Sequence, residues 1–103
     1  MDAPEVTTEE LAVARDAGAV VVDVRTDEEW AAGHVPGIRH IPLAELADRW
    51  EAELPDDETI YVICHTDGRS RAAASALIKA GADAVVVVGG TVKWAEEGRP
   101  LES

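Results

Sequence analysis

Cysteine occurs only once in the 103 residues of this sequence, at Cys64. A single thiol cannot form a disulfide within the chain, and it cannot supply a Cys-x-x-Cys redox pair or a cysteine-rich zinc site. These three kinds of cysteine chemistry are therefore excluded. Any reaction that uses Cys64 proceeds without a second thiol from the same chain.

Basic residues are also scarce: nine Lys and Arg stand against 21 Asp and Glu, which gives a formal net charge of -12. The field of such a protein repels phosphate backbones and anionic lipid headgroups, so the composition argues against nucleic-acid and membrane-surface partners. Solubility is the simplest reason for the acidity. A protein of this charge that handles an anion needs a local positive site.

Long apolar runs are missing as well. The longest, over residues 19–22 and 84–88, are too short to span a bilayer. The first five residues contain neither a basic leader nor the apolar stretch of a secretory signal, so we expect a cytoplasmic protein. With 47% apolar residues, the chain is long enough for one core and too short for two, which predicts one domain over residues 1–103.

Short β-branched runs alternate with helical patterns along the chain. Buried strands are predicted over residues 19–24, 59–63 and 85–88. Helices are predicted after capping boxes at Thr7 and Thr26, ending at Gly18 and Gly33, and over residues 43–53, 70–80 and 91–97. This order predicts βαβ units, and hence an α/β fold with a parallel sheet covered by helices on both faces.

Ligands of such sheets bind beyond the carboxyl ends of the strands. Residues 23–25 and 64–69 follow predicted strands in this way. Cys64 lies between a strand and a helix N-terminus, where backbone N–H groups and the helix dipole favour the thiolate, the nucleophilic form. Gly68 permits a left-handed turn or a close backbone approach, and Ser70 is a candidate N-cap. Arg69 is the candidate anion ligand, whereas we expect Arg71 to be a solvated helix residue.

Four segments of the sequence resemble the rhodanese (thiosulfate sulfurtransferase) superfamily, and they cover nearly the whole chain. They are residues 21–30, residues 33–42, the loop from Cys64 to Ser70, and Gly89-Gly90 leading to Trp94, Gly98 and Pro100-Leu101. Their order and spacing make the resemblance specific. It implies a single rhodanese-like domain with a mainly parallel central sheet of about five strands.

The resemblance implies that Cys64 is a catalytic nucleophile at the start of a six-residue loop. Its thiolate would take the outer sulfur of a donor such as thiosulfate, and the resulting persulfide would pass that sulfur to cyanide or a thiol. The implied substrate-binding residues are His65, Thr66, Asp67, Gly68, Arg69 and Ser70. No metal or organic cofactor is required, and a sulfur-relay protein is a further candidate partner.

Two positions depart from the family pattern. Asp67 stands at the fourth loop position, where many members have glycine, and glycine follows only at Gly68. An acid in the loop opposes a dianion, so thiosulfate is less favoured than the persulfide chemistry itself. Ile38 stands where the family usually has a small residue.

Three polar residues outside the loop are interpreted as structural. We expect Arg25 to pair with Glu28 or Glu29, and Asp23 to accept backbone N–H bonds. His34 precedes Val-Pro-Gly and is expected to brace that turn. The side chain of His65, which directly follows the nucleophile, is expected to point outward.

Two other functions were compared with sulfur transfer. Cysteine phosphatases and arsenate reductases place five residues between cysteine and arginine, whereas four separate Cys64 from Arg69 and six separate it from Arg71. That spacing does not fit a cradle for a tetrahedral oxyanion. A non-enzymatic module that binds a partner or relays persulfide sulfur stays open, although the presence of the cysteine argues against a purely structural domain.

Overall fold

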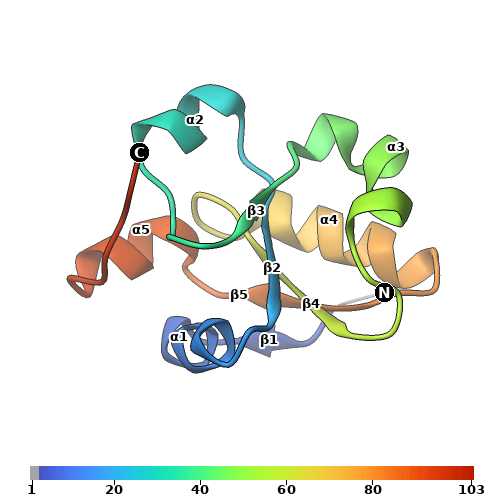
Figure 1. Cartoon of the computed structure of the whole chain (residues 1–103), viewed down its shortest axis with the longest axis horizontal. Coiled ribbons are helices and arrows are strands. Elements are labelled where there is room, and N and C mark those ends of the chain that lie inside the picture. The colour runs from blue at the N-terminus through green and yellow to red at the C-terminus, as the bar shows by residue number, and fades with distance from the viewer. Residues whose placement is uncertain (1–2) are drawn as a thin grey trace.

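In the computed structural model, which describes residues 3–103, one five-stranded sheet lies between helices (Figure 1). The strands are β1 (Glu5–Val6), β2 (Val20–Asp23), β3 (Arg39–His40), β4 (Thr59–Ile63) and β5 (Asp83–Val87). The helices are α1 (Thr8–Asp16), α2 (Asp27–Ala32), α3 (Leu43–Glu53), α4 (Gly68–Lys79) and α5 (Gly90–Glu96). The strand order is β1-β5-β4-β2-β3 and all neighbouring pairs are parallel, which confirms the predicted α/β sheet.

The core forms two clusters, one on each face of the sheet. On one face, Leu46 of α3 and Leu77 of α4 pack with alternate residues of the central strands. On the other face, Leu11 of α1 and Trp94 of α5 pack with Ile63 and the remaining strand residues. Because both faces are covered, the central strands consist largely of consecutive apolar residues, as parallel strands usually do.

The two predicted capping boxes are both present. The Thr7 hydroxyl accepts a hydrogen bond from the Glu10 backbone N–H, and the Glu10 carboxylate accepts one from the Thr7 backbone N–H. Thr26 and Glu29 exchange the same pair of bonds at the start of α2. These local bonds satisfy backbone groups that the first turn of a helix leaves without partners.

Several element boundaries agree with the sequence pattern, and others do not. Helix α3 and strand β4 have the predicted bounds, whereas α4 begins at Gly68, two residues before the predicted start. The two edge strands, β1 and β3, were not predicted individually, since two residues are too few for a periodic signal.

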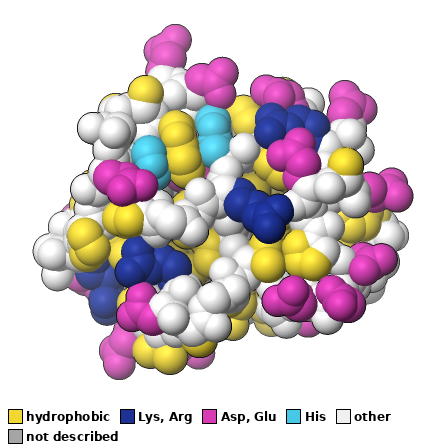
Figure 2. Space-filling model, viewed as in Figure 1, with side chains coloured by type: hydrophobic (Ala, Val, Ile, Leu, Met, Phe, Trp, Pro, Cys, Tyr) yellow, Lys and Arg dark blue, Asp and Glu magenta, His cyan; other side chains and the backbone are white. Residues whose placement is uncertain are grey.

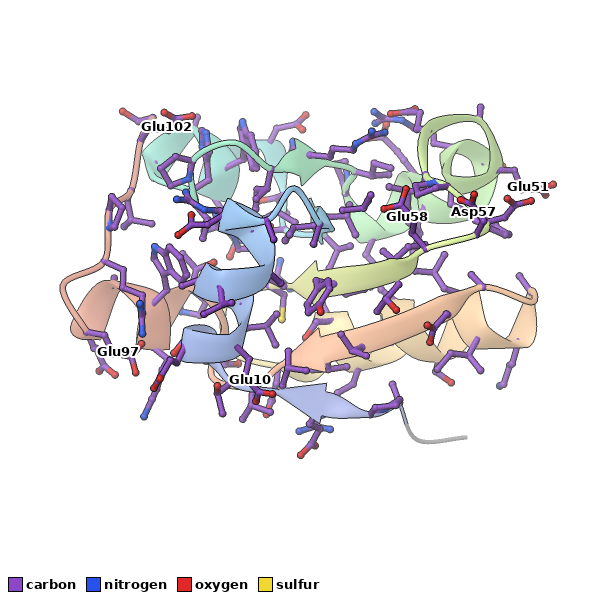
Figure 3. The ribbon with its side chains drawn as sticks, turned by 60° about the horizontal axis from the view of Figure 1, so that its bottom comes forward. Glu10, Glu51, Asp57, Glu58, Glu97 and Glu102 are labelled. Carbon is purple, nitrogen blue, oxygen red and sulfur yellow. The ribbon has the colours of Figure 1, made fainter. Side chains whose placement is uncertain are left out.

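Acidic side chains surround the molecule. In the face shown in Figure 2 they spread around the outline, and basic side chains gather at a few places. Figure 3 labels six exposed acidic residues, which come from separate parts of the chain: Glu10, Glu51, Asp57, Glu58, Glu97 and Glu102. Within residues 3–103, none of the helices combines the length and the hydropathy needed to cross a bilayer.

Candidate active site

Cys64 directly follows β4 and lies under the start of α4. Only 1% of its surface is exposed, and it belongs to the core cluster on the α3 and α4 face. Its Sγ is 3.4 Å from the hydroxyl of Ser70, which is itself fully buried and donates to the Asp67 carbonyl oxygen at 3.0 Å. The N-cap assignment for Ser70 was therefore wrong, because α4 begins earlier and Ser70 lies inside its first turn.

The loop is shorter than predicted, because Gly68 and Arg69 already belong to α4. Asp67 occupies the N-cap position, but its side chain does not cap the helix. Its carboxylate instead contacts Arg71, with 3.3 Å between Oδ2 and Nη2. Gly68 has helical geometry and no positive φ, so of its two predicted roles the left-handed turn was wrong, and the close approach of its backbone to a ligand stays a prediction.

The glycine that permits a close approach is Gly90, at the start of α5. It has a φ of +58°, and a Cβ placed on it would lie 2.4 to 2.6 Å from the carbonyl oxygens of Thr66, Cys64 and His65. In the sequence, Gly89-Gly90 was identified only as the start of the segment that leads to Trp94. The contact joins segments that are far apart in the chain, so no local pattern could have revealed it.

Backbone hydrogen bonds fasten the loop to α5. The Thr91 backbone N–H and hydroxyl both donate to the Cys64 carbonyl oxygen, at 2.8 and 3.1 Å, and the Val92 N–H donates to the His65 carbonyl at 3.0 Å. In a trans peptide unit the N–H points opposite to the C=O. The N–H groups of His65 and Thr66 are therefore directed away from α5.

Arg69 does not stand free as an anion ligand. Its guanidinium makes two hydrogen bonds to the Glu29 carboxylate, at 2.6 and 2.9 Å, across 40 residues of sequence. These bonds lower the pKa of Glu29 from 4.5 to about 2, and they raise the pKa of Arg69. The pair connects α2 to the first turn of α4.

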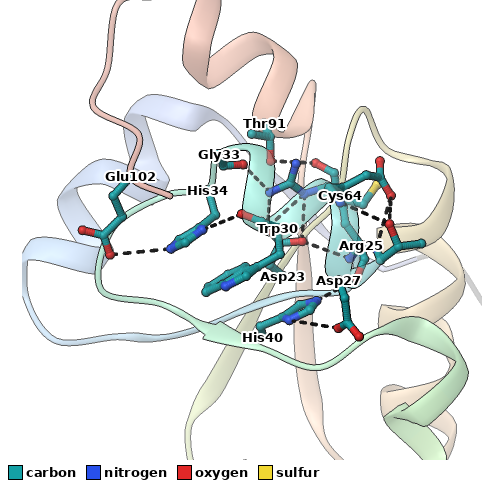
Figure 4. Close-up of polar contacts among 12 residues, drawn as sticks. Asp23, Arg25, Asp27, Trp30, Gly33, His34, His40, Cys64, Thr91 and Glu102 are labelled. Atoms are coloured by element: carbon teal, nitrogen blue, oxygen red, sulfur yellow. Dashed lines mark hydrogen bonds and ion pairs between the residues drawn. The ribbon is translucent and has the colours of Figure 1, made fainter.

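Arg25 pairs with a different carboxylate from those predicted. Its Nε lies 3.0 Å from both oxygens of Asp23, and its Nη2 also donates to the Gly33 carbonyl at 2.8 Å (Figure 4). Asp23 and Arg25 are 0% and 4% exposed. Because a buried charge without a partner of opposite sign is strongly destabilising, the two side chains pair with each other. The predicted pairing of Arg25 with Glu28 or Glu29 was therefore wrong. Asp23 does accept the Arg25 backbone N–H, as expected.

Two histidines and a tryptophan hold the segment next to this buried pair. Trp30 lies between His34 and His40, with ring centroids 3.5 and 4.7 Å apart (Figure 4). His34 Nδ1 is 2.8 Å from the Trp30 carbonyl oxygen in α2, so this contact holds the end of that helix, and the bracing of the Val-Pro-Gly turn stays a prediction. His40 Nε2 is 2.8 Å from the Arg25 carbonyl oxygen. The end of β2 is therefore rigidly packed.

A pocket of about 470 Å³ lies beside the Cys64 loop. Residues from the end of β2, from α2 and its end, from the Cys64 loop, from α5 and from the C-terminal segment line it: Arg25, Glu29, Ala32, Gly33, His65, Thr91, Val92, Ala95, Glu96 and Leu101. His65 is exposed and borders this pocket, so its side chain points outward as predicted. Among residues 3–103, no three His, Cys, Asp or Glu side chains are grouped to hold a metal ion.

The site is thus a single cysteine at the end of a central parallel strand, followed by a short loop and a helix, in an α/β domain. Residues 7–97 match the family described as "Rhodanese-like domain". The chain belongs to this family, as the four sequence segments implied.

Three similar proteins illustrate the match. YrkF of Bacillus subtilis, whose name suggests a sulfur carrier, is 39% identical over 94 residues, which are 88% of this chain and 50% of that protein. The thiosulfate sulfurtransferase GlpE of Pseudomonas fluorescens is 36% identical over 81 residues, which are 78% of this chain and 73% of that protein. The crystal structure of a rhodanese-related protein from Thermoplasma volcanium has a TM-score of 0.88 and 33% identity, over 96% of this chain and 97% of that one. The chain thus spans about half of the length of YrkF.

Proposed function

We propose that this protein is a rhodanese-type sulfurtransferase that carries sulfur as a persulfide on Cys64. The observation that carries this proposal is the fixed orientation of the loop. Because Thr91 and Val92 bind the carbonyl oxygens of Cys64 and His65, the N–H groups of His65 and Thr66 point away from α5, and we infer that they face inward, toward the space that the loop encloses. Inward N–H groups stabilise the negative charge of a terminal persulfide sulfur. Family membership and the names of the similar proteins support the same reaction.

The proposed reaction has two balanced steps. In the first, the Cys64 thiolate attacks the outer sulfur of the donor, the donor S–S bond breaks, and sulfite leaves when the donor is thiosulfate. In the second, cyanide or a thiolate attacks the terminal sulfur of the persulfide, the S–S bond on Cys64 breaks, and thiocyanate or a new persulfide leaves. Cys64 returns as the thiolate, so neither step needs a cofactor.

The loop residues have distinct proposed roles in these steps. The backbone N–H groups of His65, Thr66 and Asp67 would surround the terminal sulfur of the persulfide. Gly68 leaves space at the start of α4, because no atom lies within 4 Å of a Cβ placed on it. Ser70 positions the sulfur through its hydroxyl. The start of the twelve-residue helix α4 adds the partial positive charge of a helix N-terminus.

Intact mass spectrometry tests the proposal directly. The protein is incubated with thiosulfate, and separately with a cysteine desulfurase and cysteine, and we expect one added sulfur atom from at least one donor. The matched control is Cys64→Ser, which differs by a single atom and should fold normally yet gain no sulfur. A persulfide on the Cys64→Ser protein, or no sulfur uptake by the native protein from either donor, would refute the proposal.

A further inference from the structure

We propose that Glu29 is a specificity-determining residue: by occupying Arg69, it makes the site select organic persulfides over the thiosulfate dianion. This inference rests on the proposed function of Cys64 and concerns only the identity of the donor.

The geometry of the pair is the first step. Both guanidinium nitrogens at the end of Arg69 contact Glu29, one to each carboxylate oxygen. The two side chains remain 35% and 30% exposed, so the pair is accessible from solvent. A two-bond contact of this kind uses the same donors that would hold a sulfonate or sulfate-like group. As long as Glu29 holds Arg69, an anionic donor meets a guanidinium whose charge is already matched.

The other two arginines of the site are also paired with carboxylates. Arg25 is held by Asp23 inside the protein. Arg71 contacts both Glu5 and Asp67. All three arginines therefore have carboxylate partners, in a protein of net charge -12. A dianion bound by any one of them competes with the carboxylate already paired to it.

An organic persulfide avoids this cost. In the step Cys–S⁻ + R–S–SH → Cys–S–SH + R–S⁻, the donor S–S bond breaks, the thiolate leaves, and no dianion enters the loop. The pocket beside the loop can hold the R group, since Ala32, Val92, Ala95 and Leu101 contribute apolar surface to it.

Steady-state kinetics on Glu29→Gln test the inference with two probes, thiosulfate and the hydropersulfide of 2-mercaptoethanol, whose R group carries no charge. Glutamine keeps the capping-box acceptor for Thr26 but removes the charge that holds Arg69. We expect kcat/KM for thiosulfate to rise about fivefold at low ionic strength, mainly through KM. We expect kcat/KM for the hydropersulfide to change by less than about twofold, which also shows that the variant is folded.

Two further variants distinguish an effect of the Glu29–Arg69 ion pair from a general effect of removing one negative charge. Glu96→Gln removes one negative charge from the same pocket, and it should raise thiosulfate use by less than about twofold. The double variant Glu29→Gln/Arg69→Ala should lose the gain, because the gain acts through Arg69. An equal rise in Glu29→Gln and Glu96→Gln, or a gain that survives without Arg69, would overturn the inference.

The outcome distinguishes this inference from the proposed function. If neither donor adds sulfur to Cys64 in any variant, the proposed function itself is wrong. If the native protein accepts sulfur and Glu29→Gln leaves the ratio of the two donors unchanged, only the role of Glu29 is wrong.

Discussion

Two strand ends lie side by side at the carboxyl edge of the sheet, and they differ in how their charges are held. At the end of β2, Asp23 and Arg25 form a buried pair. At the end of β4, the Cys64 loop has exposed side chains, and its Arg69–Glu29 pair is about one-third exposed. The first region is a rigid brace, and the second is a surface that a ligand can enter. The ends of two neighbouring strands therefore have different roles, because the charged pair at the end of β2 is buried and the pair at the end of β4 is accessible to solvent.

Removing the arginine from each pair gives the largest expected contrast. Arg25→Ala leaves Asp23 as an uncompensated buried charge, which should lower the free energy of unfolding by about 3 to 5 kcal/mol. Arg69→Ala removes a pair that is about one-third exposed and should cost no more than about 1 kcal/mol. Denaturant unfolding of both variants measures the difference. Equal losses would contradict the distinction between the buried brace and the open loop.

The close contact at Gly90 gives the next largest effect. Gly90→Ala places a Cβ against three loop carbonyls at a positive φ, and it should lower the free energy of unfolding by about 3 kcal/mol. Displacement of the loop should also reduce the rate of sulfur transfer by about tenfold or more.

Gly18→Ala is the matched control for this contact. Gly18 has a φ of +88° with no atom within 4 Å of the added Cβ. The free energy of unfolding of Gly18→Ala should fall by only about 1 kcal/mol, because alanine is disfavoured in the left-handed conformation. The rate of sulfur transfer should be unchanged. Similar behaviour of the two variants would show that the backbone conformation matters and the loop contact does not.

The pH dependence of the exposed pair is a smaller effect. The folded-state pKa of Glu29 is about 2, below the ordinary value of 4.5, because Arg69 donates to its carboxylate. A carboxyl group whose pKa is lower in the folded than in the unfolded protein stabilises the fold at pH values above the unfolded-state pKa. This stabilisation is lost as the pH falls through the folded-state pKa. The stability difference between the native protein and Glu29→Gln should thus be constant above pH 4.5 and shrink toward pH 2. Unfolding curves across this range measure it, and a difference that grows on acidification would contradict the pairing.

Asp67 is expected to have the smallest effect. Its carboxylate contacts Arg71, and the two side chains are 42% and 43% exposed. Asp67→Asn should therefore change kcat/KM for thiosulfate by less than about twofold. Kinetics at low salt check this. A several-fold gain that salt suppresses would instead mean that the carboxylate acts on the sulfur site.

Much of the framework follows from local pattern. The capping boxes at Thr7 and Thr26, the amphipathic helix over residues 43–53 and the buried strand over residues 59–63 depend on bonds and periodicities within a few residues. The position of Cys64 between a strand and a helix follows from the same signals. The short edge strands β1 and β3 contain no such signal, because partners from elsewhere in the chain create them.

The sequence by itself therefore determined the order of the helices and of the three buried strands, the family and the location of the single thiol. Only the tertiary structure decided which charges meet and which backbones touch. Arg69 finds Glu29 across 40 residues, and the Gly90 backbone meets the Cys64 loop from another helix. Secondary-structure signals arise from neighbours along the chain, whereas these contacts arise from how helices pack at one edge of the sheet. The buried position of Arg25 likewise pairs it with Asp23, which is also buried, and not with Glu28 or Glu29.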